Sequence, residues 1–215
     1  MAEVELAALR AQMNPHFVFN CLNSINTFIL LNDPKNASGY LQKFSKLIRK
    51  VLDASRSEFI SLHDELETLR YYIELEQMRY GGRFQYQISI QDNLPLDGLE
   101  LPPMLVQPFV ENAIWHGLMN RDGDGGMLLL DISRQGNVLC IIVEDNGIGR
   151  KKAADLKSRS AVAHKSHGLQ VTDERIKIIN ELYSTQASVE ILDLFDPQGV
   201  AQGTRVTLKI PLEGA

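Results

Sequence analysis

The clearest candidate for chemistry in this chain is EDNGIG, residues 144–149, which follows an apolar run typical of a strand. A carboxylate at a strand end can accept a hydrogen bond from an exocyclic amine, and glycines after it let the backbone approach a flat ring closely. Asp145, Gly147 and Gly149 therefore predict a site for an amino-substituted ring. An Asn-Gly pair is also an ordinary turn signal, so the motif alone leaves both interpretations open.

A second motif, QPFVENAIWHG, lies upstream and places Gln107, Glu111 and Asn112 on a predicted helix. The amide oxygen of Asn112 can bind a hard cation such as Mg²⁺, which is otherwise held mainly by phosphates and water. The alternative is a helix whose polar side chains simply face solvent.

Two further motifs lie downstream. SHGLQ predicts a helix that starts at Gly168 with free backbone amides for a phosphate, and QGTRVTLKIP places Gly203 and Thr204 at the entry to the last strand. Each of these two motifs also has an ordinary turn interpretation.

The stretch QMNPHFVFN, residues 12–20, puts Pro15 directly before His16 inside an amphipathic helical pattern. A proline inside a helix costs about 3 kcal/mol or more, because it removes one hydrogen bond and clashes with the preceding turn. We expect the helix to continue through Pro15 with a kink. Either the kink is only tolerated, with His16 packed or solvated, or it presents the imidazole, between Asn14 and Asn20, as a nucleophile or ligand.

The elements that carry these motifs fall into two parts. Residues 1–80 have the apolar spacing of three helices, the second capped by Asp33 before Pro34 and the third by Ser61. Their wide apolar stripes predict a helical bundle that another copy of the chain completes, hence a homodimer.

After YGGR, residues 80–83, short strand-like runs alternate with two helix candidates, 102–119 and 168–183. This order predicts an α+β fold in which helices cover one side of a sheet. The expected division is a helical region at 1–80 and a sheet domain at 81–215. The strand-like runs are 86–90, 128–132, 138–143, 189–192 and 206–210.

Composition narrows the possible partners. The net charge of -5 argues against a nucleic-acid partner, because binding phosphates needs a clustered basic face. Cys21 and Cys140 lie far apart without metal-ligand spacing, so both are predicted to be small core residues. The most apolar window, residues 17–31, is interrupted by polar residues and cannot span a bilayer. The chain opens in mid-helix, which indicates a piece of a longer protein and leaves open whether a membrane anchor precedes it.

The order of the motifs resembles the Bergerat-type (GHKL) ATP-binding domain shared by gyrases and sensor histidine kinases: an Asn-bearing helix, then Asp-x-Gly-x-Gly, a glycine at a helix start, and Gly-Thr before the final strand. Ahead of it, QMNPHFVFNCLNSI is similar to the phosphoacceptor segment of LytS-type sensor histidine kinases. The resemblance extends over nearly the whole chain, including ISLHDELETLRYYIELEQMRY and LPPMLVQPFVENAIWHGL.

This resemblance implies a role for each motif. It assigns His16 as acceptor of the γ-phosphoryl group of ATP, Asp145 as reader of the adenine amino group and Asn112 as the Mg²⁺ ligand. The remaining nucleotide contacts that it implies are Gly147 and Gly149 at the adenine, Gly168 and Leu169 beside the phosphates under a mobile lid at 150–167, and Gly203 and Thr204 at the pocket floor.

The chain departs from the usual kinase pattern at three places. Phe17 stands where many histidine kinases have an acidic residue after the phosphoacceptor, so Asn20 or Glu111 is the candidate to orient the proton. Trp115 stands where a basic phosphate contact is frequent, which leaves His116, Lys165 or backbone amides for the phosphates. The segment KSRSAVAHKSHGLQVT, residues 157–172, finally, carries a single glycine where related kinases often have several.

The resemblance implies the cytoplasmic catalytic core of a two-component sensor kinase. In such a core, ATP phosphorylates His16 and the phosphoryl group passes to an aspartate of a response regulator. Two alternatives are a non-catalytic dimeric module that ATP switches, and a conformational ATPase.

Overall fold

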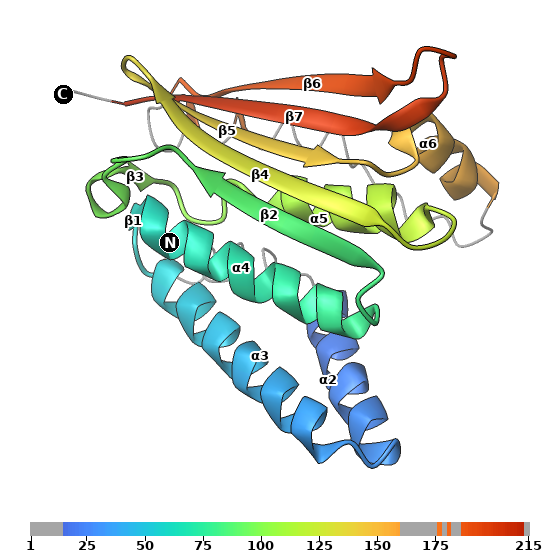
Figure 1. Ribbon diagram of the computed structural model, residues 1–215. Coiled ribbons are helices and arrows are strands. Elements are labelled where there is room, and N and C mark those ends of the chain that lie inside the picture. The colour runs from blue at the N-terminus through green and yellow to red at the C-terminus, as the bar shows by residue number, and fades with distance from the viewer. Residues whose placement is uncertain (1–14, 160–175, 178–179, 182–185, 213–215) are drawn as a thin grey trace.

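The computed structural model of the chain describes residues 15–159, 176–177, 180–181 and 186–212. Three helices come first and a layer of strands and helices follows (Figure 1). The predicted α+β class is therefore confirmed. The helices of the first part are α2 (Pro15–Leu30), α3 (Pro34–Ala54) and α4 (Leu62–Arg79).

The helix starts follow the predicted capping residues. The Asp33 side chain accepts a hydrogen bond from the Asn36 amide at 3.1 Å, with Pro34 in the first turn of α3. Ser61 caps α4 by accepting from the Asp64 amide at 3.1 Å. A side-chain oxygen at this position satisfies an amide that has no partner within the helix, which sets where the helix begins. The predicted kink at Pro15 involves residues before 15, which lie outside the described part of the chain.

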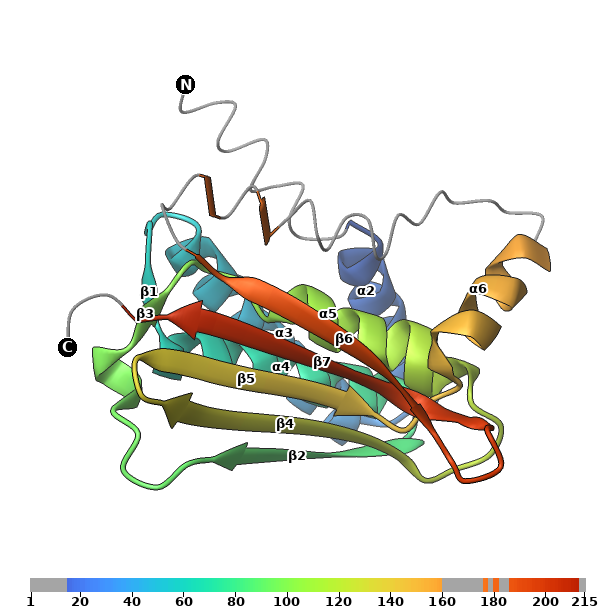
Figure 2. The same cartoon turned by 90° about the horizontal axis from the view of Figure 1, so that it is seen from above.

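The five-stranded sheet has the order β2-β4-β5-β7-β6, which Figure 2 shows from above. Only β2 and β4 are parallel, and the other neighbours are antiparallel. Leu128, Leu130 and Ile132 alternate along β4 as the buried side, as a sheet covered on one face requires. The strands are β2 (Phe84–Ile90), β4 (Gly126–Gln135), β5 (Val138–Asp145), β6 (Ser188–Phe195) and β7 (Ala201–Pro211).

One continuous helix at residues 107–120 covers the sheet together with α4 (Figure 1). It consists of α5 (Gln107–Asn112), a π-helical segment (Ala113–Gly117) and a 3₁₀ turn (Leu118–Asn120). The sequence predicted this helix but not its π-helical segment, a distortion that is frequent at functional sites. The second helix candidate, 168–183, lies mostly outside the described residues.

Three short elements were not predicted from the sequence. The two-residue strand β1 (Ile60–Ser61) comes directly before α4 in the sequence. It pairs with the two-residue strand β3 (Glu100–Leu101). Helix α6 (Gly149–Arg159) occupies the first part of the segment expected to form a lid. The rest of that segment, 160–167, lies outside the described residues, so its mobility stays a prediction.

Helix α4 is attached to the sheet layer by a buried carboxylate. Glu65, 1% exposed, accepts hydrogen bonds from the backbone amides of Met104 and Val106, each at 3.0 Å. Both amides lie at the start of helix 107–120, where the helix dipole also favours a negative charge. The core is accordingly one cluster that extends from Phe17 in α2 to Ile210 in β7. The division at residue 80 stays a prediction, and packing is continuous across it.

The two cysteines and the apolar length of the helices were also considered in the sequence. Cys21 and Cys140 are buried free thiols, which confirms their assignment to the core. Among the described helices, none combines the length and apolar character needed to cross a membrane.

Replacing Glu65 with alanine is expected to lower the free energy of unfolding by roughly 2–6 kcal/mol, because two buried amides lose their acceptor at about 1–3 kcal/mol each. The matched control is Glu67→Ala on the same helix, whose carboxylate is 37% exposed and pairs with Lys50. An exposed pair contributes about 0–1 kcal/mol, so the control should remain near wild type. Urea denaturation of both variants measures the difference, and equal losses would show that Glu65 is not an anchor.

Candidate active site

Asp145, the last residue of β5, is a buried carboxylate at 4% exposure. Burial raises the pKa of Asp145 to about 7; the neighbouring Glu144 adds to the rise, and a hydrogen bond from the Gly147 amide opposes it. That amide donates to Asp145 Oδ1 at 2.8 Å. Within the described part of the chain, no cationic side chain forms an ion pair with Asp145. The site therefore keeps a carboxylate out of water without a compensating charge, a costly arrangement that is typical of functional sites.

Bare glycine backbone surrounds this carboxylate. A Cβ on Gly117 would clash with Asp145 Oδ1, and one on Gly147 would clash with the backbone of Gly117. Gly203, with φ +128°, approaches the Asp145 carbonyl so closely that a Cβ there would also clash. Helix 107–120 can therefore touch the end of β5 only because Gly117 and Gly147 lack side chains, and β7 can approach Asp145 as closely only because Gly203 lacks one.

The structure places the other predicted ring-pocket residues at the same end of the sheet. Thr204 on β7 lies directly opposite Asp145 in the strand register. Gly149 begins α6 with φ +74°, and its Cβ would lie 2.9 Å from that of Ala201. The Arg150 guanidinium fixes the start of α6 to β6 through two 2.6 Å hydrogen bonds to Asp193.

Sequence reasoning missed Gly117. Gly117 was predicted only as one position of the helix at 102–119, and WHG was the signal that could have drawn attention to it, as a glycine inside a helical pattern. Its role becomes visible only with β5 in place, since Gly117 also accepts the Ile148 amide at 3.3 Å.

Helix 107–120 carries Glu111, Asn112 and His116 toward Gly117. Gln107 Nε2 donates to Glu111 Oε1 at 2.8 Å, which orients the carboxylate. Gln107 Oε1 is the one buried side-chain oxygen or nitrogen without a hydrogen-bond partner among the described residues. Asn112 is half-buried five positions before Gly117, roughly 7 Å along a helix. Asn112 therefore lies near Asp145 but is not one of the residues that surround its carboxylate.

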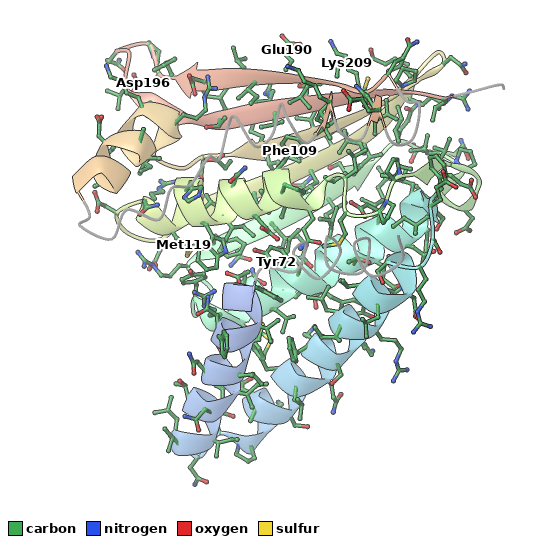
Figure 3. All side chains as sticks on the ribbon, turned by 180° about the vertical axis from the view of Figure 1, so that it is seen from behind. Tyr72, Phe109, Met119, Glu190, Asp196 and Lys209 are labelled. Atoms are coloured by element: carbon green, nitrogen blue, oxygen red, sulfur yellow. The ribbon has the colours of Figure 1, made fainter. Side chains whose placement is uncertain are left out.

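His16 lies in the first turn of α2, and the structure describes its backbone but not its side chain. The following residue, Phe17, is buried and packs its ring against Tyr72 of α4, with centroids 5.0 Å apart. Asn20, the other candidate on this helix, is half-buried. Figure 3 shows Tyr72 where the first turns of α2 approach α4 and helix 107–120.

Trp115 takes a different role from the basic residue that its position suggested. Its indole N–H donates to the Tyr72 hydroxyl oxygen at 3.2 Å, and the Arg79 guanidinium lies 4.8 Å from its ring centroid. The side chain thus faces α4. The predicted phosphate-side residues Gly168, Leu169 and Lys165 lie outside the described residues.

Comparison with known proteins finds related sequences. A family model for histidine kinases matches residues 4–84. The sensor histidine kinase/phosphatase LytS of Staphylococcus aureus strain MRSA252 is 37% identical over 152 residues, which is 71% of this chain and 26% of that protein. The same protein of strain Mu50 matches with the same identity and coverage.

The chain is a member of the histidine kinase family. The resemblance to LytS-type kinases is thereby confirmed, and membership implies the use of ATP. The chain spans about a quarter of the length of these LytS relatives.

Solved histidine kinase structures are more distant from this family member. The histidine kinase domain of a blue-light activated kinase from Erythrobacter litoralis matches with a TM-score of 0.49 and 16% identity, over 79% of this chain and 75% of that chain. The kinase AdeS of Acinetobacter baumannii matches with a TM-score of 0.47 and 12% identity, over 86% of this chain and 83% of that chain.

Gly117→Ala is expected to weaken ATP binding by at least tenfold, because the added methyl group would push the Asp145 carboxylate away from its place. Gly39→Ala in α3 is the matched control, since a Cβ there meets nothing within 4 Å. Titration calorimetry with ATP measures both variants. Wild-type affinity in Gly117→Ala would show that the Asp145 pocket does not hold the nucleotide.

Proposed function

We propose that this chain is the catalytic core of a two-component sensor histidine kinase. It binds Mg-ATP, phosphorylates His16 and passes the phosphoryl group to an aspartate in the receiver domain of a response regulator. The observation that carries the proposal is the buried, cation-free Asp145 carboxylate against glycine backbone, reached by the helix that bears Glu111 and Asn112.

The adenine end of ATP fits the observed geometry. An exocyclic amine donates a hydrogen bond, and Asp145 is an acceptor without a cationic partner among the described residues. Gly147, Gly149 and Gly203 let the backbone around Asp145 pack closely, against Gly117, Ala201 and Asp145 itself, so that the carboxylate is held in one place. A guanine presents a carbonyl oxygen at the same place, which the carboxylate would repel, so adenine is preferred.

The phosphate end would lie along helix 107–120. Asn112 has no hydrogen bond from its side-chain amide to any described residue, so its oxygen is available for Mg²⁺. The described residues include no cluster of three His, Cys, Asp or Glu side chains able to hold a metal ion. The proposed ion is therefore one that phosphates hold and Asn112 orients, and when bound it neutralises phosphate charge.

The chemical step needs a neutral imidazole. A ring nitrogen of His16 forms a bond to the γ-phosphorus while the bond from that phosphorus to the bridging oxygen breaks, and ADP leaves. We assign Glu111 to accept the proton that the phosphorylated ring gives up, with Asn20 as the alternative for orienting that proton. Burial is the main cause that raises the pKa of Tyr72 and of Glu76, and the Glu111 charge adds to both rises, so Glu111 acts on the side of the helix that faces α4.

The catalytic assignment is tested by separating nucleophile from nucleotide site. His16→Ala should leave Mg-ATP affinity within about threefold of wild type and abolish phosphate incorporation, because only the acceptor is lost. Asn112→Ala should lower both the affinity for Mg-ATP and the phosphate incorporation, because the cation loses a positioned ligand. Incorporation is measured as acid-labile, alkali-stable label from γ-labelled ATP.

The same measurement separates the alternatives. Label that persists in His16→Ala at the wild-type level would identify another acceptor and contradict the proposal. Release of phosphate to water without any labelled protein would indicate a conformational ATPase, and ATP binding without turnover would indicate a switched interaction module.

We further propose that two copies associate through α2 and α3. Large apolar side chains are exposed there, although the sequence pattern placed some of them in a buried stripe. Phe19, Leu22 and Ile29 share one side of α2 and are 66%, 50% and 61% exposed. A helix that buries Phe17 on one side and exposes a second apolar stripe has a surface suited to a symmetric partner.

The double variant Leu22→Glu and Ile29→Glu is expected to be monomeric at concentrations where the wild-type chain is a dimer, because four buried carboxylates would face one another across the symmetric interface. Leu192→Glu is the control, at similar exposure on β6. Sedimentation equilibrium measures the mass. A wild-type chain that stays monomeric at high micromolar concentration would contradict the proposed dimer.

The response regulator, a membrane-attached sensor region and a cytoplasmic location complete the proposal. They rest on the family relationship with sensor kinases. None of them enters the tests above.

A further inference from the structure

A buried cluster connects the helix that carries His16 with the helix that carries Glu111 and Asn112. It lies where α2, α4 and the π-helical segment meet, on the side of α4 that faces away from solvent (Figure 3). Its members are aromatic or charged rather than aliphatic, which is unusual for a packing contact. They are Phe17, Tyr72, Glu76, Arg79 and Trp115.

Two contacts join the three elements in sequence. The Phe17 ring packs on the Tyr72 ring at 5.0 Å between centroids, with 35° between the planes. The Trp115 indole N–H then donates to the Tyr72 hydroxyl oxygen at 3.2 Å. Tyr72 is 1% exposed, and burial holds the pKa of its hydroxyl well above the usual value, so the hydroxyl stays neutral. Only one packing contact and one hydrogen bond therefore separate α2 from helix 107–120.

A buried ion pair holds Trp115 in place from the other side. Arg79 Nη1 donates to both carboxylate oxygens of Glu76, at 3.1 and 3.2 Å, and Glu76 is completely buried. The same guanidinium lies over the Trp115 ring at 4.8 Å. An arginine fixed by a carboxylate and stacked on an aromatic ring has little freedom, so the indole plane has little freedom too.

The position of Trp115 determines the orientation of the neighbouring site residues. Glu111 and Trp115 are four positions apart and so lie on neighbouring parts of one helix side, with Asn112 between them in sequence. The π-helical turn begins at Ala113, directly after Asn112. The position of α2 against the indole therefore also fixes the position of α2 relative to the carboxylate and the amide.

We propose that Tyr72 and Trp115 are positioning residues for phosphoryl transfer. Their hydrogen bond sets the placement of the His16-bearing helix relative to Glu111 and Asn112, and it carries movements of α2 to the nucleotide site. The inference rests on the proposed kinase function. It adds the contact that fixes the position of the His16-bearing helix relative to the nucleotide site.

Phosphoryl transfer is sensitive to such placement, because the protein contributes mainly position and charge. Reacting atoms must approach to about 3–3.5 Å, and a misplacement of about 1 Å can cost on the order of 100-fold in rate. Binding of ATP depends on Asp145 and its glycines, which lie beyond the cluster. Loss of the hydrogen bond should therefore slow the transfer and leave nucleotide affinity unchanged.

The test is Tyr72→Phe in the full chain, which removes the hydroxyl and keeps the ring that packs on Phe17. The initial rate of acid-labile labelling at saturating Mg-ATP is expected to fall at least tenfold, with the dissociation constant of Mg-ATP within twofold of wild type. Tyr71→Phe is the matched control on the next residue, whose half-buried hydroxyl donates to Glu67 at 3.2 Å. It should label within twofold of wild type.

Trp115→Phe and the double variant test whether the two residues act together. If the hydrogen bond is what positions the helices, the double variant should label no more than twofold slower than the slower single variant. Trp115 is the only tryptophan in the chain, so tryptophan fluorescence reports on the surroundings of this one indole. Tyr72→Phe should shift the emission maximum, and Tyr71→Phe should not.

A wild-type labelling rate in Tyr72→Phe would overturn the inference. A loss of Mg-ATP affinity in proportion to the loss of rate would also overturn it, because such a loss indicates general destabilisation. Should Tyr72→Phe not fold, Trp115→Phe decides by the same split between rate and affinity. Failure of the kinase proposal is distinguishable, because the wild-type chain would then show no label that depends on His16.

Discussion

The structure depends on the close approach of helix 107–120 to the end of β5, where glycine backbone encloses the Asp145 carboxylate. This contact is possible only because Gly117 and Gly147 carry no side chains, and Gly203 lets β7 come equally close to the Asp145 carbonyl. It is unfavourable for the chain alone, because burial raises the pKa of Asp145 to about 7 and no described cation compensates the charge. Packing elsewhere must offset this cost, and the site is thereby prepared for a ligand that donates a hydrogen bond.

Helix α4 supplies much of that packing. Near its start, the buried Glu65 carboxylate accepts two backbone amides from the beginning of helix 107–120, and further along it Tyr72 accepts the Trp115 indole N–H. Two attachments spaced along one helix define the orientation of the other more strictly than either would alone. The helical part and the sheet part therefore form one packed body in the described chain, whose core extends from α2 to β7.

This arrangement distributes the proposed chemistry over three elements. The ring-binding carboxylate ends a central strand, the cation ligand and the candidate base lie on the helix beneath it, and the phosphoacceptor lies on a helix of the bundle. Aromatic contacts between the bundle and the helix bridge the last two. Such a division lets a signal that moves α2 affect the reaction without passing through the adenine pocket, which is consistent with a sensor kinase in which ATP binding and phosphoryl transfer are regulated separately.

The sequence by itself determined the features that depend on short-range chemistry. Asp33 and Ser61 cap their helices as predicted, because a side-chain oxygen needs only the amide three residues ahead. The five strands follow the apolar alternation, and the order of the motifs identified the kinase family. The roles that the motifs imply for the site residues stay predictions. Tertiary structure alone decided the rest: Gly117 faces Asp145, Glu65 reaches Val106, and Trp115 turns toward α4 instead of phosphate. Helix α6 lacks an apolar stripe and is joined to β6 by the Arg150–Asp193 ion pair. These features join residues about 30 to 45 positions apart. The pattern of neighbouring residues does not determine which distant part of the chain each of them will contact.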